Sequence, residues 1–220
     1  MNLSRTRGIV TFVGPVAAGK TTLILSVRSY LKRNDVNVAF FAYKTHLVTF
    51  ARLMRRLSPN NHYSVYQRVF GVLALFDLVA LLSETAFLFI LSRFMVVLVE
   101  DGLIGTLNDY AYISRIYLRK ASSSRAALRI ILTSLLAFRP ACIIYLDVDA
   151  DESARRQQLR GDSSLEHRSY LRFQSEFLRY LAILVAKNTE SGLLLVDTSQ
   201  GTATSESVEV IERVFPKHDR

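Results

Sequence analysis

Five short apolar runs recur along the chain, and each is bounded by turn-forming or polar residues. They lie at Ile9–Val13, Val38–Tyr43, Met95–Glu100, Cys142–Asp147 and Leu193–Asp197. Continuous apolar runs of this length are typical of strands buried on both faces, because a parallel sheet is covered by helices on each side. The pattern therefore predicts five buried parallel strands.

Segments with the helical repeat of apolar positions separate these runs. The predicted helices are Lys20–Arg33, Val65–Leu82, Ala86–Phe94, Ser123–Ala137, Glu152–Arg160, Glu166–Lys187 and Ser205–Val214. Strands that alternate with helices indicate βαβ units. We therefore predict an α/β fold with a doubly wound five-stranded parallel sheet flanked by helices. Because no Pro-, Gly- or Ser-rich linker divides the 220 residues, we expect a single domain over residues 1–220.

The longest apolar stretch, Gly71–Met95, raises the alternative of membrane association. Asp77, Glu84 and Arg93 interrupt it at intervals that a bilayer-spanning helix of about 20 residues accommodates only at high cost. We expect buried helices here and no membrane insertion. The single cysteine, Cys142, leaves no disulfide framework, and the N-terminal residues lack a signal-peptide core. A reducing, cytoplasmic location is therefore expected.

The charge of the chain narrows the range of partners. The formal net charge is +9, and 22 of the 28 basic residues are arginines, whose guanidinium forks suit phosphate groups. Charge alone leaves three alternatives: a nucleotide, a nucleic acid, or a surface that is merely basic. Because no aromatic residues interleave with the basic clusters in an RNA-binding pattern, no specific nucleic-acid partner is expected.

A glycine-bounded turn favours the nucleotide. Residues 14–21, GPVAAGKT, match the phosphate-loop pattern and lie between a predicted strand and a predicted helix. Backbone N–H groups at the start of a helix can wrap phosphates. Lys20 would bridge the β- and γ-phosphates, Thr21 would hold Mg²⁺, and Thr22 would meet the α-phosphate. The predicted nucleotide-binding residues of this loop are Gly14, Pro15, Val16, Ala17, Ala18, Gly19, Lys20, Thr21 and Thr22.

Two acids follow the third apolar run. Glu100 and Asp101 end the segment VVLVED, which we expect to be the strand beside the first, opposite the phosphates. A carboxylate there can hold a Mg²⁺-bound water or accept the proton of an attacking hydroxyl. Both acids could instead cap the following helix. Glu100 is the predicted metal-binding and catalytic residue, and Asp101 is a predicted substrate-binding residue.

Basic residues follow the second apolar run. Cations just past a strand end would face an acceptor phosphate, and the alternative is a solvated basic helix face. Lys44 is favoured because it leaves the strand directly, whereas His46 is expected to have no chemical role. The residues predicted to bind the acceptor here are Lys44, Thr45 and Arg52, with Arg55 and Arg56 close by.

Arginines also follow the fourth apolar run. Asp149 is expected to cap a helix that carries Arg155, Arg156 and Arg160. This is the layout of a short arginine-bearing lid, at about residues 150–165, that closes over a transferring phosphoryl group and excludes water. Ordinary surface arginine on an amphipathic helix is the alternative.

Together these segments resemble the thymidylate kinase-like branch of the nucleoside monophosphate kinases. The resemblance rests on FVGPVAAGKTTL, VVLVEDGLIGTL, IIYLDVDADESARRQQLRGD and LLLVDTSQ, which stand in the family's order over nearly the whole chain. The chain looks closest to divergent archaeal proteins of this branch, in which a lysine-threonine pair follows the second strand, as Lys44 and Thr45 do here.

The resemblance implies a P-loop kinase architecture and transfer of the ATP γ-phosphoryl group, with Mg²⁺, to a nucleoside monophosphate, of which dTMP is the expected one. It also implies a homodimer and a place in dTTP biosynthesis. By this resemblance, Glu100 corresponds to the family's acidic residue. The three arginines after the fourth strand correspond to the arginines of the family's lid. The residues that it implies for adenine contact are Thr198, Ser199 and Gln200.

The chain departs from the family after its acidic residue. The family has an arginine and an aromatic residue there, whereas this chain has Asp101 and Gly102. The acceptor therefore stays open, as dTMP, another nucleotide, a nucleoside or another small molecule. Two further classes also stay open: a P-loop ATPase coupled to a partner's motion, and a nucleotide-binding protein without catalysis. The arginine-bearing segment after the fourth strand favours the kinase.

Overall fold

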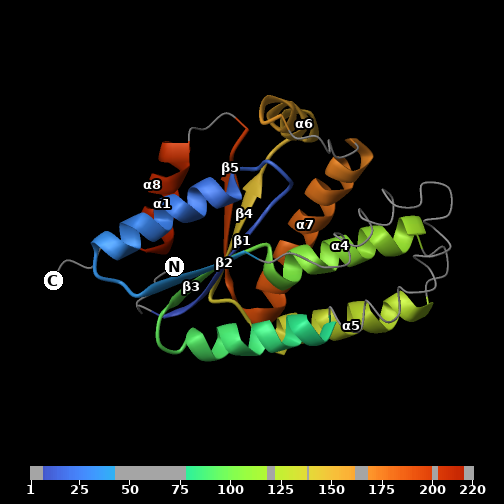
Figure 1. Cartoon of the computed structure of the whole chain (residues 1–220), viewed down its shortest axis with the longest axis horizontal. Helices are drawn as coiled ribbons and strands as arrows, with labels where there is room; N and C mark the ends of the chain where they lie inside the picture. Colours follow the sequence, from blue (N-terminus) through green and yellow to red (C-terminus); the bar gives the residue numbers. More distant parts are fainter. Residues whose placement is uncertain are drawn as a thin grey trace.

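A five-stranded sheet lies at the centre of the molecule (Figure 1). The computed structural model describes residues 7–42, 78–117, 122–137, 139–161, 168–199 and 203–215 of the chain. The strands are β1 (Gly8–Val13), β2 (Val38–Ala42), β3 (Val96–Glu100), β4 (Cys142–Asp147) and β5 (Gly192–Asp197). All neighbouring pairs are parallel, in the order β2-β3-β1-β4-β5. The predicted α/β fold with a doubly wound five-stranded parallel sheet is confirmed.

Helices cover both faces of this sheet (Figure 1). Helices α1 (Lys20–Arg33) and α8 (Ala203–Val214) pack on one face, and α4 (Gly102–Tyr117), α5 (Ser122–Ala137) and α7 (Arg168–Thr189) pack on the other. Residues 78–91 form a further helix, which contributes to the same core as α4 and α5. Helix α6 (Ala150–Leu159) follows β4, and it contacts α7.

The alternation of side chains along each strand explains this three-layer arrangement. On β4, Ile143 and Tyr145 join the core beneath α4, α5 and α7, whereas Ile144 joins the core beneath α1 and α8. Successive strand residues point to opposite faces, so a strand that is apolar throughout requires helices on both sides. Full burial of an apolar side chain of this size contributes about 1.5–3 kcal/mol.

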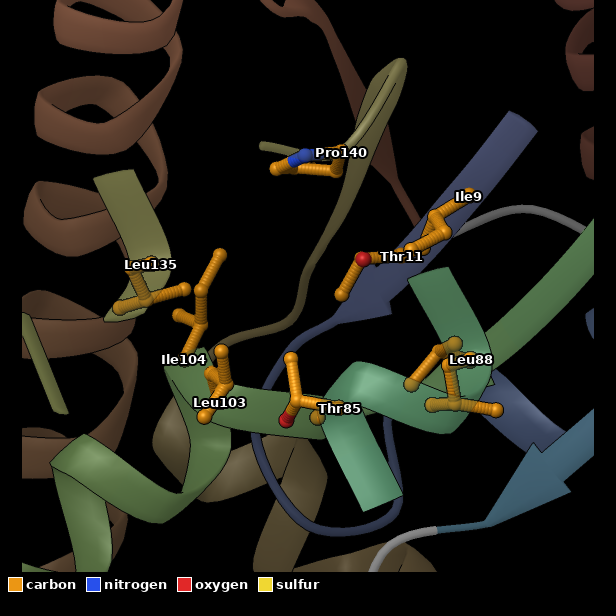
Figure 2. A pocket seen from close by; sticks show the side chains of 10 residues that line it. Ile9, Thr11, Thr85, Leu88, Leu103, Ile104, Leu135 and Pro140 are labelled. Atoms are coloured by element: carbon orange, nitrogen blue, oxygen red, sulfur yellow. The ribbon is translucent and has the colours of Figure 1, made fainter. Parts of the chain in front are cut away.

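A small cavity lies between the sheet, at β1 and β3, and the helices α4, α5 and residues 78–91 (Figure 2). Its volume is about 40 Å³, and its lining is apolar apart from Thr11 and Thr85. The Thr85 hydroxyl already donates to the carbonyl of Leu81 at 2.7 Å. Small-molecule sites occupy about 300–1,000 Å³, so this cavity cannot hold a nucleoside and belongs to the packing of the core.

Two helical predictions are wrong. Helix α4 occupies residues for which the hydrophobic pattern predicts no element. The sequence also predicts a break between Leu82 and Ala86, but the helix runs through residues 78–91 without interruption. The hydroxyls of Ser83 and Thr85 donate to carbonyls four residues earlier, at 2.9 Å and 2.7 Å, so these residues bond within the helix instead of ending it.

The other predicted helices begin and end within two residues of the observed ones, and α1 matches at both ends. Most of the predicted helix Val65–Leu82 lies outside the described residues, as does Tyr43 at the end of the second apolar run. Among the helices that the structure describes, none is long and apolar enough to cross a membrane.

Candidate functional site

The predicted phosphate loop connects β1 to α1 at the carboxyl edge of the sheet. Gly19 is the N-cap residue of α1 and has φ 89°, a left-handed conformation that glycine adopts without steric cost. Gly14 lies against β4, where an added Cβ would stand 2.6 Å from the carbonyl oxygen of Leu146. The two glycines thus let the loop turn into the helix and pack tightly on the sheet.

Lys20 is the first residue of α1, and its side chain folds back over the loop. Its ammonium group donates to the carbonyl oxygens of Gly14 at 2.7 Å and Pro15 at 2.9 Å. The same group lies 3.4 Å from a carboxylate oxygen of Asp101, and the Lys20 side chain is only 8% exposed. A positive charge is therefore fixed inside the curve of the loop.

Thr21 and Glu100 are in direct contact. Strand β3 pairs with β1 so that Glu100 stands beside Phe12, two residues before the loop begins. The Thr21 hydroxyl donates to the two carboxylate oxygens of Glu100, at 2.9 Å and 3.1 Å. Two residues predicted to bind a metal, 79 positions apart in the sequence, are thus brought together.

The donor set at this point fits Mg²⁺. The Thr21 hydroxyl and the Glu100 carboxylate are oxygen donors, which Mg²⁺ prefers, and Mg²⁺ is commonly held by one or two carboxylates together with phosphates and water. Among the described residues, no group of three or more His, Cys, Asp or Glu side chains could hold a metal. If Mg²⁺ binds here, other groups such as phosphate oxygens and water would have to complete its ligands.

Asp101 turns the chain from β3 into α4. Its backbone has φ 60°, a left-handed conformation that aspartate tolerates better than most residues, and its N–H donates to the carbonyl of Phe12 at 2.8 Å. Burial raises the pKa of the Asp101 carboxyl from 3.8 to about 6, against the lowering effect of Lys20 and with smaller raising effects from Glu100 and Asp109. The charges of Glu100 and Asp109 thus act on Asp101, which itself lies beside the Lys20 ammonium.

We expect Asp101→Asn to stabilise the protein above pH 6. A carboxyl whose folded pKa is raised binds its proton more tightly in the folded state, so its ionisation removes stability as pH rises from about 4 to about 6. Because 32% of the Asp101 side chain is exposed, water screens part of this effect. We therefore expect the free energy of unfolding to rise by about 1–2 kcal/mol. Urea unfolding of both proteins between pH 4 and pH 7 measures it. A stability difference that is constant across this range would contradict the raised pKa.

The three predicted lid arginines take different positions. Arg155 is 60% exposed, and its guanidinium forms a fork with Glu152 at 2.6 Å and 2.7 Å. Arg156 contacts Glu152 at 2.8 Å, the carbonyl of Ala17 at 3.4 Å and the carbonyl of Thr198. Arg160 is exposed at the C-cap of α6. Only Arg156 reaches the phosphate loop among the contacts that the structure describes here.

The carboxyl group that pairs with these arginines has a lowered pKa. Hydrogen bonds from Arg155 and Arg156 lower the pKa of the Glu152 carboxyl to about 2. Asp149 occupies the N-cap position of α6, as predicted, but its side chain makes no capping hydrogen bond. Asp149 therefore does not supply the predicted side-chain cap, and the helix packs through Ala150, Ser153 and Gln157, which are buried.

The segment after β5 lies next to the arginine helix. Thr198 is fully buried, and its hydroxyl donates to the carbonyl of Asp147 at 2.8 Å. Ser199 donates through its N–H and its hydroxyl to the Asp197 carboxylate, at 2.9 Å and 2.5 Å. Contact with an adenine ring would therefore come from Ser199 or from the backbone, since the Thr198 side chain faces the interior.

Comparisons with known proteins extend this picture. No family model and no curated protein sequence matches the chain. The structure of deoxyadenosine kinase from M. mycoides with bound dCTP has a TM-score of 0.65 at 12% identity and covers 93% of this chain and 97% of that one. The chain has the fold of a P-loop kinase.

Two further structures of the same M. mycoides enzyme agree. The one with bound dATP has a TM-score of 0.57 at 13% identity, covering 93% of this chain and 98% of that one. The one with products dCMP and a flexible dCDP has a TM-score of 0.55 at 13% identity, covering 93% and 97%. At 12–13% identity, the similarity to these structures shows only that the fold is shared. The coarser part of the resemblance seen in the sequence is thus supported, and the thymidylate kinase branch stays a prediction.

Several predicted site residues lie outside the part of the chain that the structure describes. Lys44, Thr45 and Arg52, predicted for the acceptor, lie outside the described residues, and so does Gln200. His46, Arg55 and Arg56 also lie outside them. Thr22 is exposed on the first turn of α1, beside Thr21.

Sequence reasoning missed two residues that contact the loop. The Gln174 side chain of α7 accepts a hydrogen bond from the Val16 N–H at 2.9 Å, and the Ser153 hydroxyl of α6 donates to the Val16 carbonyl at 2.6 Å. Gln174 stands on the buried face of α7 between Leu171 and Leu178. A glutamine at a core position of an amphipathic helix is the sequence feature that could have drawn attention to it.

Proposed function

We propose that the chain is an ATP-dependent P-loop kinase that transfers a phosphoryl group to a hydroxyl of a nucleoside-type acceptor. The observation that carries this proposal is the contact between Thr21 and Glu100 beside the ammonium of Lys20. A hydroxyl, a carboxylate and a cation gathered at a phosphate loop are the groups that phosphoryl transfer uses.

In this reaction the loop amides and Lys20 would hold the β- and γ-phosphates, and Thr21 with Glu100 would hold Mg²⁺. Bound Mg²⁺ supplies positive charge to the phosphate oxygens. Glu100 would also be placed to accept the proton that leaves the attacking hydroxyl, since it lies on the strand beside the loop. Positioning and charge compensation supply most of the rate enhancement in such reactions.

The arginines of α6 would complete the site as a lid. Arg155 is exposed and paired with Glu152, so it would have to leave Glu152 before it contacted a phosphoryl group. Arg156 would tie the lid to the loop through the carbonyl of Ala17, and Arg160 would join from the end of the helix. Adenine would pack against the segment at Ser199. Closure of this lid would exclude the water that otherwise hydrolyses ATP.

We propose a deoxynucleoside as the acceptor. Asp101 stands 3.4 Å from the Lys20 ammonium, and the charges of Glu100 and Asp109 act on Asp101. A phosphate dianion that approached along this side would meet like charge, whereas an uncharged nucleoside would not. The structural neighbours named above are deoxyadenosine kinases, which agrees with this choice.

A nucleoside monophosphate, dTMP, is the second candidate. It is favoured by the order of the family segments in the sequence and by the pair Lys44 and Thr45, which would face an acceptor phosphate. The homodimer, the cytoplasmic location and the link to dTTP biosynthesis follow from the same resemblance and stay predictions.

A panel of acceptors tests the proposal. Purified protein with ATP and Mg²⁺ is incubated with each deoxynucleoside and each deoxynucleoside monophosphate, and both ADP and the phosphorylated product are measured. We expect ADP release and a new phosphoester with at least one deoxynucleoside, and slower turnover with dTMP. ADP release without a phosphoester, raised by a protein partner, would instead favour the coupled ATPase.

A further inference from the structure

One residue of the phosphate loop, Val16, is held through its backbone by helices that come much later in the chain. The Val16 N–H donates to Gln174 Oε1 at 2.9 Å, and the Val16 carbonyl accepts from Ser153 Oγ at 2.6 Å. Gln174 is 7% exposed, and Ser153 is fully buried. Two buried polar side chains thus bond to the two successive peptide units that flank the Val16 Cα, which fixes the orientation of both.

The next residue explains why the loop needs this support. Ala17 has φ 62°, a left-handed conformation that carries a steric penalty for any residue with a Cβ. Its carbonyl accepts from Arg156 at 3.4 Å. Such a conformation persists only where the surrounding structure holds it. Side chains of α6 and α7 therefore maintain a turn that the loop sequence alone does not favour.

The orientation of the Gln174 amide is itself fixed. Tyr170 donates its hydroxyl proton to Asp109 Oδ1 at 3.1 Å, so its oxygen accepts from Gln174 Nε2 at 3.2 Å. With its amino group engaged in this way, Gln174 turns its carbonyl oxygen toward the Val16 N–H. The Tyr170 ring is held by an edge contact with Tyr112, at 4.4 Å between centroids. A chain of contacts thus runs from α4 through α7 to the loop.

We propose that Gln174 is a positioning residue of the phosphate loop, which keeps residues 16–17 in the shape that binds a polyphosphate. This inference rests on the proposed function, since it supposes that the loop binds ATP. Gln174 acts through the Val16 peptide and needs no contact with the nucleotide. Without it the loop populates other shapes, and the apparent affinity for ATP falls in proportion to the fraction of loop that stays competent.

Three variants test the proposal. Gln174→Met keeps the length of the side chain and removes the hydrogen bond to Val16. Tyr170→Phe leaves that bond but removes the group that orients the Gln174 amide. Thr189→Val is the matched control, because Thr189 is a buried polar residue at the other end of α7, where its hydroxyl donates to Val185 at 2.7 Å.

The first measurement needs no nucleotide. We expect hydrogen exchange of the Val16 amide to be at least about fivefold faster in Gln174→Met than in the wild type, because loss of one hydrogen bond changes an opening equilibrium by this order. Exchange in β1 is expected to stay unchanged. An equally protected Val16 amide in Gln174→Met would overturn the proposal whatever the protein binds.

The second measurement is ATP binding and turnover. We expect Gln174→Met to weaken ATP binding about five- to tenfold and to raise the KM for ATP equally, with kcat at saturating ATP within about threefold of the wild type. Tyr170→Phe should weaken ATP binding about two- to threefold. If Gln174→Met does not fold, Tyr170→Phe by itself tests the proposal. Thr189→Val should lower the unfolding temperature and leave ATP affinity unchanged.

The outcomes separate this inference from the proposed function. A wild-type protein that binds no ATP would overturn the function, and the role of Gln174 with it, while leaving the exchange result as a description of the loop. A wild-type protein that binds ATP, with Gln174→Met or Tyr170→Phe of equal affinity, would overturn the positioning role alone. Equal weakening by Thr189→Val would also overturn it, because general loss of stability would then explain the effect.

Discussion

Lys20→Ala is expected to abolish phosphoryl transfer, with a fall in kcat/KM of about 10³-fold or more. The Lys20 ammonium is the one cation of the described residues that is fixed within the curve of the phosphate loop, where it donates to Gly14 and Pro15. Arg156 also contacts the loop, but it does so at the carbonyl of Ala17 and is paired with Glu152, so it does not stand in the place of the Lys20 ammonium. Radiolabelled phosphate transfer to the acceptor found in the panel measures the loss.

Lys32→Ala is the matched control for this experiment. Lys32 lies in the last turn of the same helix and is exposed, so its loss changes the net charge equally without touching the loop. Its activity should stay within about twofold of the wild type, as expected for an exposed site. Circular dichroism establishes that Lys20→Ala keeps the fold. Turnover retained by folded Lys20→Ala would overturn the assigned role of Lys20.

Glu100→Gln is expected to lower kcat by about 10²–10³-fold while ATP affinity changes little. Glutamine has the shape of glutamate and can still accept the Thr21 hydrogen bond, but it has no charge to hold Mg²⁺ and cannot accept a proton. The Mg²⁺ concentration for half-maximal activity should rise for the same reason. Steady-state kinetics over a Mg²⁺ series, with ATP binding measured separately, distinguish these effects.

The control for Glu100→Gln is Glu84→Gln. Glu84 is exposed on the helix at residues 78–91, far along the chain from the loop, and its neutralisation makes the same change in net charge. We expect wild-type kinetics from it. If Glu100→Gln also turns over at the wild-type rate, Glu100 has only a structural role at the end of β3 and takes no part in the chemistry.

The strands were predictable because their pattern is local and redundant. In β4, the apolar residues follow one another without interruption, which indicates a strand covered on both faces. The observed bounds, Cys142–Asp147, agree with the prediction. The phosphate loop was predictable for a related reason. Its glycines and Lys20 act within eight consecutive residues, so the sequence holds the whole motif in one place.

Helix α4 was not predictable from the same kind of pattern. It begins at Gly102 and includes Gly105 and the buried Asn108, which weaken the helical pattern that apolar spacing would otherwise give. Its stability comes from packing against α5 and α7. Tertiary burial therefore overrides the local preference, as it does for most helices in globular proteins.

By itself, the sequence determined the positions of the five strands, the phosphate loop and the presence of acids at the end of β3, because each depends on neighbouring residues. Only the tertiary structure decided which distant groups meet: Glu100 with Thr21, Asp101 with Lys20, and Gln174 with Val16. The physical reason is that hydrogen bonds and ion pairs depend on separations of about 3 Å. Residues 79 or 158 positions apart reach such separations only through the register of the sheet and the packing of helices on it.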